Sequence, residues 1–529
     1  MTHCPFCQSP ADSSVLAEAS WAPAEVVARI ARDNPQWRRE DGACPACLQQ
    51  FLLEVLLARG EQGLHETIQD VWPLDAEAAY GALPTPLRMH ADPHHVGRGV
   101  TLAMVDSAFF PHPDLTDPVN RIKAWVNATV DPPEAHFFTP DQTPRWKGWD
   151  DGRAIQWHGL MTSVVAAGNG TRSQGLYRGL ASGADVVLVQ VSNNRGHITD
   201  AAIERALRWL KRHAGRLGLR VVNLSVVGDS GPSPDSPIDK AASALVRMGV
   251  VVVSAAGNDG VRRLYPPSTC PDAITVGGLD DNNSLDHEQH RVWHSNYGES
   301  TIGALKPELV APSIWLVGPL LPATNEHQHA SNLFFLSSVG DSAAEKEIVE
   351  RKLVSPHYKL VEGTSFAAPI VASTIACMLE ANPGLTPDLV RQCLAAACHR
   401  VPGAPVEQQG LGAIDSGQAV AHALRAKGGA MEGFSLSPDV RRNETVFLLR
   451  NVKAEQVEVF GSWNEWKGSV EAFQIAAGVW RASGPALKPG RYNYKFLIDR
   501  KHWMDDPSNP RKVPDGHSGF NSIIVVGRG

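Results

Sequence analysis

The chain has 529 residues, of which 43% are hydrophobic, and a formal net charge of −7. This length is enough for two to four domains with their own cores. The negative charge offers no basic surface to nucleic acid or to an anionic membrane, and no apolar run approaches the roughly 18 residues that a membrane-spanning helix needs. The composition therefore predicts a globular protein that binds neither nucleic acid nor membrane.

The first 90 residues are expected to form a small zinc-binding and helical segment. Two Cys-x-x-Cys pairs, Cys4 with Cys7 and Cys44 with Cys47, supply four thiols at a spacing that suits a tetrahedral Zn²⁺ ion. The segment is similar to zinc ribbons, although its spacer is longer and includes a helix predicted near 24–33. Four thiolate ligands leave no open position for catalysis, so we expect the zinc to be structural.

Disulfides are the alternative interpretation of the same cysteines. Residues 1–7 lack a basic region followed by an apolar one, so the sequence predicts no secretory signal and a cytoplasmic protein. A cytoplasmic chain would keep these thiols reduced, which favours zinc. Beyond the second pair, residues 48–58 have the apolar spacing of a helix, and prolines between 83 and 95 indicate a linker.

Four polar residues in the next part of the chain each stand at the end of a predicted element. Asp106 and Asn258 follow buried-strand patterns, His158 precedes a helix of small residues, and Ser365 follows Gly363 at the start of a long apolar helix. Open α/β sheets build their sites at the carboxyl ends of strands. A helix N-terminus stabilises a developing oxyanion. The pattern therefore predicts a nucleophilic site.

Spacer motifs accompany these residues at 112–115, 295–298, 306–312 and 363–365. With them, residues 95–425 resemble the subtilisin-like serine proteases, or subtilases, and the order Asp, His, Ser is that of subtilisin. The resemblance implies a peptidase domain over residues 91–428. It implies an α/β fold with a doubly wound, mostly parallel sheet, and a serine endopeptidase that acts on a protein or peptide substrate.

The resemblance also assigns a role to each of the four residues. Ser365 would attack the peptide carbonyl while His158 takes its proton, and Asp106 would hold His158 in the right tautomer. Asn258 and the Ser365 backbone N–H would bind the oxyanion of the tetrahedral intermediate. Taken singly, each residue also fits a plain structural role at a strand end, helix cap or turn.

Several positions depart from the usual family pattern. Ala108 and Leu160 stand where members have glycine and threonine, and Val227 and Leu264 stand where many have glycine. Because Val227 and Leu264 would narrow the first specificity pocket, we expect a small side chain before the scissile bond. The residues expected to contact substrate are Ser225, Val226, Val227, Gly257 and Leu264. A catalytically inactive scaffold with the same fold is the alternative function.

Two stretches of the peptidase region are longer than the family minimum. One lies between Asp106 and His158, and the other lies between Pro312 and Gly363. Both flank the motifs, so both could form walls of the substrate cleft. Helices are predicted near 343–353, 388–397 and 417–425, and a linker near 427–433.

The last part of the chain, residues 440–529, has short strand patterns between turn signals and is predicted to be an Ig-like β-sandwich. Its motifs at 460–466, 490–496, 503–507 and 521–524 resemble the glycogen- and starch-binding modules found beside branching enzymes. The resemblance implies binding of glycogen or another α-glucan, with stacking by tryptophan and hydrogen bonds to sugar hydroxyls. The residues concerned are Trp466, Lys495, Trp503 and Asn521.

Two questions about this module and the metals stay open from the sequence. Such sandwiches also serve as protein-interaction modules, and either tryptophan could belong to the core. The protein could then be mainly a glucan-binding adaptor with a peptidase that serves one partner. Subtilases often carry calcium, but the carboxylate spacing in this sequence defines no calcium cage.

Overall fold

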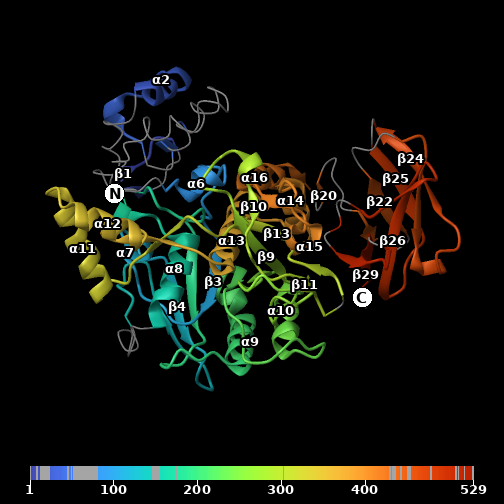
Figure 1. Ribbon diagram of the computed structural model, residues 1–529, viewed down its shortest axis with the longest axis horizontal. Coiled ribbons are helices and arrows are strands. Elements are labelled where there is room, and N and C mark those ends of the chain that lie inside the picture. The colour runs from blue at the N-terminus through green and yellow to red at the C-terminus, as the bar shows by residue number, and fades with distance from the viewer. Residues whose placement is uncertain are drawn as a thin grey trace.

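The structure is a computed structural model that describes residues 2–6, 10–11, 24–43, 47–48, 51, 82–145, 155–173, 175–301, 303–427, 430–431, 437–440, 444–449, 454–476, 479–506, 509, 511–517 and 519–526. A large α/β body occupies the centre of the molecule (Figure 1). The C-terminal strands lie beside it at one end, and the described N-terminal residues lie against its opposite upper side.

The centre of the α/β body is an eleven-stranded sheet in the order β17-β18-β13-β9-β8-β7-β3-β6-β4-β5, with β10 paired to β9. The strands from β4 to β18 along this path pair in parallel, and β5, β10 and β17 are antiparallel additions. The predicted mostly parallel sheet is confirmed. The strands are β3 (Thr101–Asp106), β4 (Ile122–Asn127), β5 (Glu134–Phe137), β6 (Asp185–Gln190), β7 (Leu219–Leu224), β8 (Val251–Ala255), β9 (Ile274–Asp280), β10 (Arg291–Val292), β13 (Leu309–Pro312), β17 (Cys398–His399) and β18 (Ala413–Ile414).

Helices cover both faces of this sheet, which explains why its strands are apolar without alternation. In β3, Leu102 and Met104 belong to one hydrophobic core, and Ala103 and Val105 belong to the core on the other face. The first core contains α8 (Gln156–Ala167), α13 (Thr364–Ala381), α14 (Pro387–Ala397) and α16 (Ser416–Arg425), and the second contains α9 (Asp200–Leu217) and α10 (Pro237–Val246).

The helices predicted near 388–397 and 417–425 are confirmed as α14 and α16. Helix α13 is long and apolar enough to cross a membrane by length and composition, but 83% of its apolar window is buried inside the protein. It is therefore the core helix of the α/β body. Gly363 precedes it with a φ of 132°, a conformation that favours glycine.

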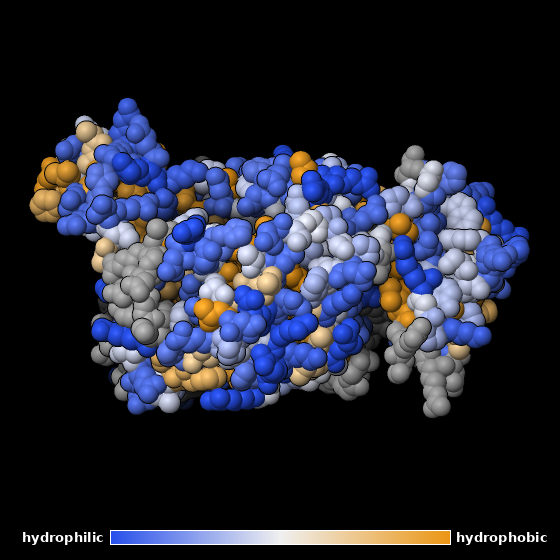
Figure 2. Space-filling view, turned by 90° about the horizontal axis from the view of Figure 1, so that it is seen from below, coloured by the Kyte–Doolittle hydropathy of each residue, from blue (hydrophilic) through white to orange (hydrophobic). Residues whose placement is uncertain are grey.

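The insertion before Ser365 forms a helical hairpin on a small sheet. It comprises β14 (Leu316–Pro319), α11 (Asn325–Ser338), α12 (Ser342–Glu350), β15 (Leu353–Ser355) and β16 (Tyr358–Val361), with the strand order β14-β16-β15. The helix predicted near 343–353 is α12, which ends at Glu350. The hairpin projects from one end of the molecule and exposes apolar side chains, including Phe335, Val339 and Val349 (Figure 2).

The described N-terminal residues form β1 (Thr2–His3), β2 (Pro10–Ala11), α2 (Ala24–Asp33) and α6 (Thr85–Arg88) around a small apolar core. Helix α2 confirms the helix predicted near 24–33, whereas most of residues 48–58 lie outside the described residues. The proline-rich stretch from 83 to 95 packs on the α/β body rather than crossing solvent. Arg88, which is 7% exposed, forms a buried ion pair with Asp281 at 2.6 Å.

The C-terminal strands form one continuous antiparallel sheet of nine strands, in the order β21-β22-β25-β24-β23-β26-β29-β28 with β27 paired to β26. The predicted β-domain is confirmed, but its described strands are not divided into two separate sheets. Strands from both halves of the order contribute to one core, so the sheet curls around it. The strands are β21 (Asp439–Val440), β22 (Thr445–Leu449), β23 (Val457–Gly461), β24 (Val470–Ala476), β25 (Val479–Gly484), β26 (Gly490–Ile498), β27 (His502–Met504), β28 (Lys512–Pro514) and β29 (Phe520–Val526).

Short elements join these parts. They are η2 (Arg39–Asp41), α7 (Pro113–Thr116), η5 (Thr171–Ser173), η6 (His287–Gln289), β11 (Gly298–Glu299), β12 (Leu305–Lys306), α15 (Val406–Gln409), β19 (Ala426–Lys427), β20 (Ala430–Met431) and η7 (Ser462–Asn464). The β-domain touches the α/β body through Arg511, whose guanidinium lies 3.9 Å from the Asp272 carboxylate.

Candidate active site

The structure brings Asp106 and His158 together at the carboxyl end of β3. Asp106 is the last residue of β3 and is fully buried, and His158 lies in the first turn of α8. The His158 Nδ1–H donates to Asp106 Oδ1 at 2.6 Å, so Nε2 is left as the basic nitrogen. Burial lowers the pKa of His158, whereas the charge and hydrogen bond of Asp106 raise it, and the net result is a pKa above the ordinary value.

Both carboxylate oxygens of Asp106 are held by further donors. The Ser107 backbone N–H donates to Oδ1 at 2.6 Å, and the Thr162 hydroxyl donates to Oδ2 at 2.7 Å. Thr162 lies one helical turn after His158, on the same face of α8. These two donors therefore hold the Asp106 carboxylate in one orientation relative to the His158 imidazole.

Helix α8 can approach β3 this closely because Gly159 has no side chain. A Cβ atom at Gly159 would lie 2.2 Å from the Ala108 carbonyl oxygen. On the other side of His158, the exposed Trp157 indole stands edge-on to the imidazole, with ring centroids 5.2 Å apart.

Ser365 lies at the N-terminus of α13, as its position after Gly363 predicts. It is partly exposed, and its backbone N–H is one of the four that a helix leaves without an intrahelical partner. The ring of the next residue, Phe366, lies 5.8 Å from the His158 ring. The Ser225 hydroxyl donates to the Ser365 carbonyl at 2.8 Å and fixes the turn from the side of β7.

Asn258 is held beside this turn by Thr364. Its Oδ1 accepts from the Thr364 backbone N–H at 2.9 Å and from the Thr364 hydroxyl at 2.8 Å. The Thr364 hydroxyl in turn accepts from the Gly257 N–H at 3.1 Å. Because the amide oxygen is occupied in this way, the amide Nδ2 is the end of Asn258 that can donate, and it lies against Gly363.

Of the other predicted substrate residues, Gly257 contacts the same turn through its hydrogen bond to Thr364. Val226 is buried and Val227 is 44% exposed, at the end of the segment that follows β7. Leu264 is only 3% exposed and packs against Gly298. Gly257 has a φ of 105° and lies too close to the Asn296 side chain for a Cβ atom.

Sequence reasoning missed Ser107, Thr162 and Thr364 as parts of this site. Thr162 could have been found, because a hydroxyl four residues after His158 must lie on the same helix face. The role of Thr364 depends on its contact with a residue 106 positions away, which no local pattern reveals. Leu160, the residue that departs from the family pattern, points into the core instead.

Two of the four predicted zinc ligands lie in the part of the chain that the structure describes. The buried Sγ atoms of Cys4 and Cys47 are 3.8 Å apart, far beyond the roughly 2.05 Å of a disulfide. Cys7 and Cys44 lie outside the described residues. Among the described residues alone, no group of three or more histidine, cysteine, aspartate or glutamate side chains could hold a metal ion.

The residues of the β-domain that were predicted to bind carbohydrate are all at least partly exposed. Trp503 is 52% exposed, and its ring packs edge-on to Phe460 at 5.1 Å. Lys495 lies opposite Phe460 in the β23–β26 register and forms an ion pair with Asp515. Asn521 and Trp466 are both partly exposed.

Comparison with known proteins agrees with the arrangement of the α/β body. The Subtilase family model matches residues 97–412. Serine protease AprX of Bacillus subtilis (strain 168) is 28% identical over 333 residues, which are 61% of this chain and 66% of the relative. The chain thus spans slightly less than two thirds of AprX. Subtilisin BL of Lederbergia lenta is 25% identical over 287 residues, which are 54% of this chain and 78% of the relative.

Among solved structures, a protease from Pseudoalteromonas arctica PAMC 21717 covers 67% of this chain and 97% of its own at 21% identity and a TM-score of 0.45. The family assignment rests on the sequence match, which extends over more than half of the chain. This chain therefore belongs to the subtilase family of subtilisin-like serine proteases.

Proposed function

We propose that the protein is a serine endopeptidase that uses Ser365 as nucleophile, His158 as general base and Asp106 as the residue that orients the base. The observation that carries this proposal is the 2.6 Å hydrogen bond from His158 Nδ1 to a buried aspartate, with the ring of Phe366, the residue after Ser365, 5.8 Å from the imidazole ring. The hydrogen bond fixes the tautomer in which Nε2 can take a proton.

In the proposed reaction, Ser365 Oγ adds to the substrate carbonyl carbon as its proton passes to His158 Nε2. The oxyanion is stabilised by the Asn258 Nδ2 group and the Ser365 N–H, at the positive end of α13. His158 then donates the proton to the leaving amine, which departs and leaves an acyl-enzyme. Water, activated by the same imidazole, hydrolyses the ester.

A fluorophosphonate probe tests this proposal directly, because it reacts only with an activated serine. We expect the wild-type protein to be labelled at Ser365 and to cleave a peptide library, and Ser365→Ala to do neither. Ser338→Ala, which changes an exposed serine of α11, is the matched control and should behave as wild type. Labelling or cleavage that survives in Ser365→Ala would refute the assignment.

We also propose that Cys4, Cys7, Cys44 and Cys47 bind one structural Zn²⁺. In a tetrahedral thiolate site with Zn–S bonds of about 2.3 Å, two sulfurs are about 3.8 Å apart. The Cys4–Cys47 separation of 3.8 Å fits this geometry. Metal analysis of the purified chain should find one zinc per molecule. Cys4→Ser should lose it and Cys377→Ala, a change of a core cysteine, should retain it; equal zinc in both variants would contradict the proposal.

For the C-terminal domain we propose binding of an α-glucan. The observation that favours it is the exposed Trp503 indole, which offers an apolar plane with a polar edge for stacking on a sugar ring. The Ser365→Ala protein should sediment with glycogen, whereas the Ser365→Ala/Trp503→Ala protein should stay in the supernatant. Phe335→Ala, at an exposed aromatic of α11, is the control. Retention that does not depend on Trp503 would overturn the assignment.

A further inference from the structure

A cavity of about 410 Å³ lies between the loop that follows β3 and the insertion that precedes Ser365. One wall comes from 110–116, and the opposite wall comes from the start of α11 and the turn between β15 and β16. The volume is in the range of pockets that hold small molecules. Nothing in the proposed catalytic mechanism uses it.

The charged and titratable residues that line this cavity are all basic. Two arginines and three histidines are among its thirteen described lining residues, and none of the thirteen is acidic. These basic residues are His112, Arg145, Arg172, His327 and His357. They come from five separate segments of the chain, so the fold has brought them together.

Several of these basic groups have nitrogen atoms that can make a further hydrogen bond. His112 is 2% exposed, and its Nδ1 accepts from the Asp114 N–H at 3.2 Å, so its Nε2 carries the proton. Within the described part of the chain, neither His112 Nε2 nor the Arg172 guanidinium has a hydrogen-bond partner. His327 Nε2 and His357 Nδ1 share a proton at 3.0 Å, which leaves one nitrogen of each ring for another contact.

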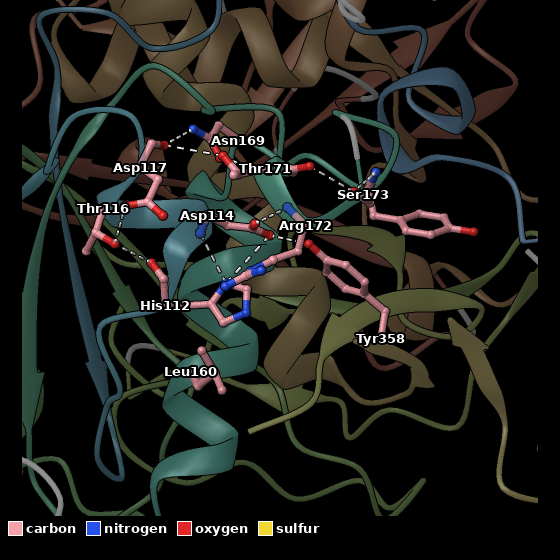
Figure 3. Close-up of polar contacts among 12 residues, drawn as sticks. His112, Asp114, Thr116, Asp117, Leu160, Asn169, Thr171, Arg172, Ser173 and Tyr358 are labelled. Atoms are coloured by element: carbon pink, nitrogen blue, oxygen red, sulfur yellow. Dashed lines mark hydrogen bonds and ion pairs between the residues drawn. The ribbon is translucent and has the colours of Figure 1, made fainter. Parts of the chain in front are cut away.

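The nearest carboxylate, that of Asp114, belongs to the wall and not to the lining. It is fully buried and accepts from the Tyr358 hydroxyl at 2.5 Å and from the Arg172 backbone N–H at 3.0 Å. Figure 3 shows the Arg172 side chain beside His112, with Asp114 joined to its neighbours and to Tyr358 by dashed lines. The Asp114 carboxylate therefore holds the wall of the cavity in place, and the Arg172 guanidinium can contact a ligand.

We propose that this cavity binds a small multivalent anion, either a phosphate ester or a polycarboxylate. Guanidinium groups pair with phosphate and carboxylate oxygens through two parallel hydrogen bonds, and imidazole N–H groups add further donors. The ligand is small because the cavity has a volume of only about 410 Å³. The inference does not depend on the proposed peptidase activity, because none of these residues belongs to the triad.

Ligand binding is expected to draw a proton into the cavity. Burial lowers the pKa of His112 to about 4, and burial followed by neighbouring positive charge lowers the pKa values of His327 and His357. An anion in contact with these rings favours their protonated forms. Arg145, Arg172, Asp114 and Tyr358 are the other charged or titratable groups around them. Affinity should therefore be higher at pH 6 than at pH 8.

Calorimetry on the full-length Ser365→Ala protein tests the site without self-digestion. Pyrophosphate and citrate are the two probes, and acetate at matched ionic strength is the monovalent control. We expect binding of pyrophosphate, citrate or both, and none of acetate. The probe that binds with the higher affinity shows whether the anion is a phosphoryl compound or a carboxylate.

Two added changes, Arg172→Gln and His357→Gln, should each weaken binding by about tenfold, as expected for loss of one charge-assisted contact. Arg195→Gln, at an exposed arginine in another loop, should leave the affinity unchanged. If Arg172→Gln or His357→Gln fails to fold, Arg145→Gln takes the place of that variant. Absence of binding at millimolar probe, or equal affinity in all variants, would overturn the proposal.

Discussion

The Thr162 hydroxyl donates a 2.7 Å hydrogen bond to Asp106 Oδ2, while His158, four residues earlier on the same helix, donates to Oδ1 of the same carboxylate. One helix thus presents two donors to one buried aspartate. Thr162 is fully buried and donates to Asp106, so its contribution is to position Asp106 and, through it, the imidazole.

Replacement of Thr162 by valine should lower kcat by about tenfold and leave KM unchanged, because a charge-assisted hydrogen bond to Asp106 is lost. Valine keeps the shape of the side chain, and Thr162→Ser should restore the rate. Steady-state kinetics on a peptide substrate measure kcat and KM separately. A change confined to KM, or a serine variant as slow as valine, would argue for a purely structural role.

The Asn258 amide should depend on Thr364 for its orientation. Asn258→Leu removes one oxyanion donor, a change that costs about 10² to 10³ in kcat in subtilisin, where that value was measured. Thr364→Val removes the hydroxyl donor to the amide oxygen and keeps the backbone N–H donor, so we expect a smaller loss of about tenfold. Both variants should still react with fluorophosphonate. If Thr364→Val were as slow as Asn258→Leu, the threonine would have a further role.

The pH dependence of kcat/KM should report the titration of His158. A general base must be neutral, so activity rises with pH through the His158 pKa, and Asp106 holds that pKa above the ordinary value of about 6.5. Asp106→Asn should move the midpoint of the acid limb down and lower the plateau. A midpoint that does not move in this variant would separate Asp106 from the titrating group.

Cleavage specificity should reflect Val227. This side chain is 44% exposed at the end of the segment after β7, so its removal costs little packing. In Val227→Gly, the ratio of kcat/KM for phenylalanine over alanine before the scissile bond should rise by at least about tenfold. Val339→Gly, at the exposed residue that follows α11, serves as the control. A wild-type enzyme that already prefers large aromatic residues would refute the narrow pocket.

Acid should destabilise the fold through His399. Its ring stacks on His287 with centroids 3.9 Å apart, and burial followed by the charges of His287 and His290 lowers its pKa to about 4. Between about pH 6.5 and 4 the unfolded chain binds more protons than the folded chain, so the free energy of unfolding falls as pH falls. The other groups that face this ring are His90 and Asp415.

His399→Phe, made in the Ser365→Ala background, should remove part of this loss. We expect the variant to lose on the order of 1 kcal/mol less stability than its parent between pH 7.5 and pH 5. Thermal unfolding at the two pH values measures the difference. Identical pH dependence in both proteins would place the acid sensitivity elsewhere.

The positions of Asp106, His158, Asn258 and Ser365 at element ends could be predicted from sequence, because apolar runs and glycines mark where strands and helices stop. The hydroxyls of Thr162 and Thr364 could not be separated from other threonines, since their roles come from contacts across the fold. The same is true of the basic cavity, whose wall joins Asp114 to Tyr358 across 244 positions.

The continuous sheet of the C-terminal domain has a consequence for how the protein behaves at high concentration. A curled sheet that does not close leaves open backbone edges, where another chain could add a strand. Here the strands at its two ends, β21 and β28, have two and three residues, and β28 carries Lys512 and Pro514. Such short, charged and proline-bearing edges offer few backbone groups to a strand of another chain, so pairing of this domain through β21 or β28 is disfavoured.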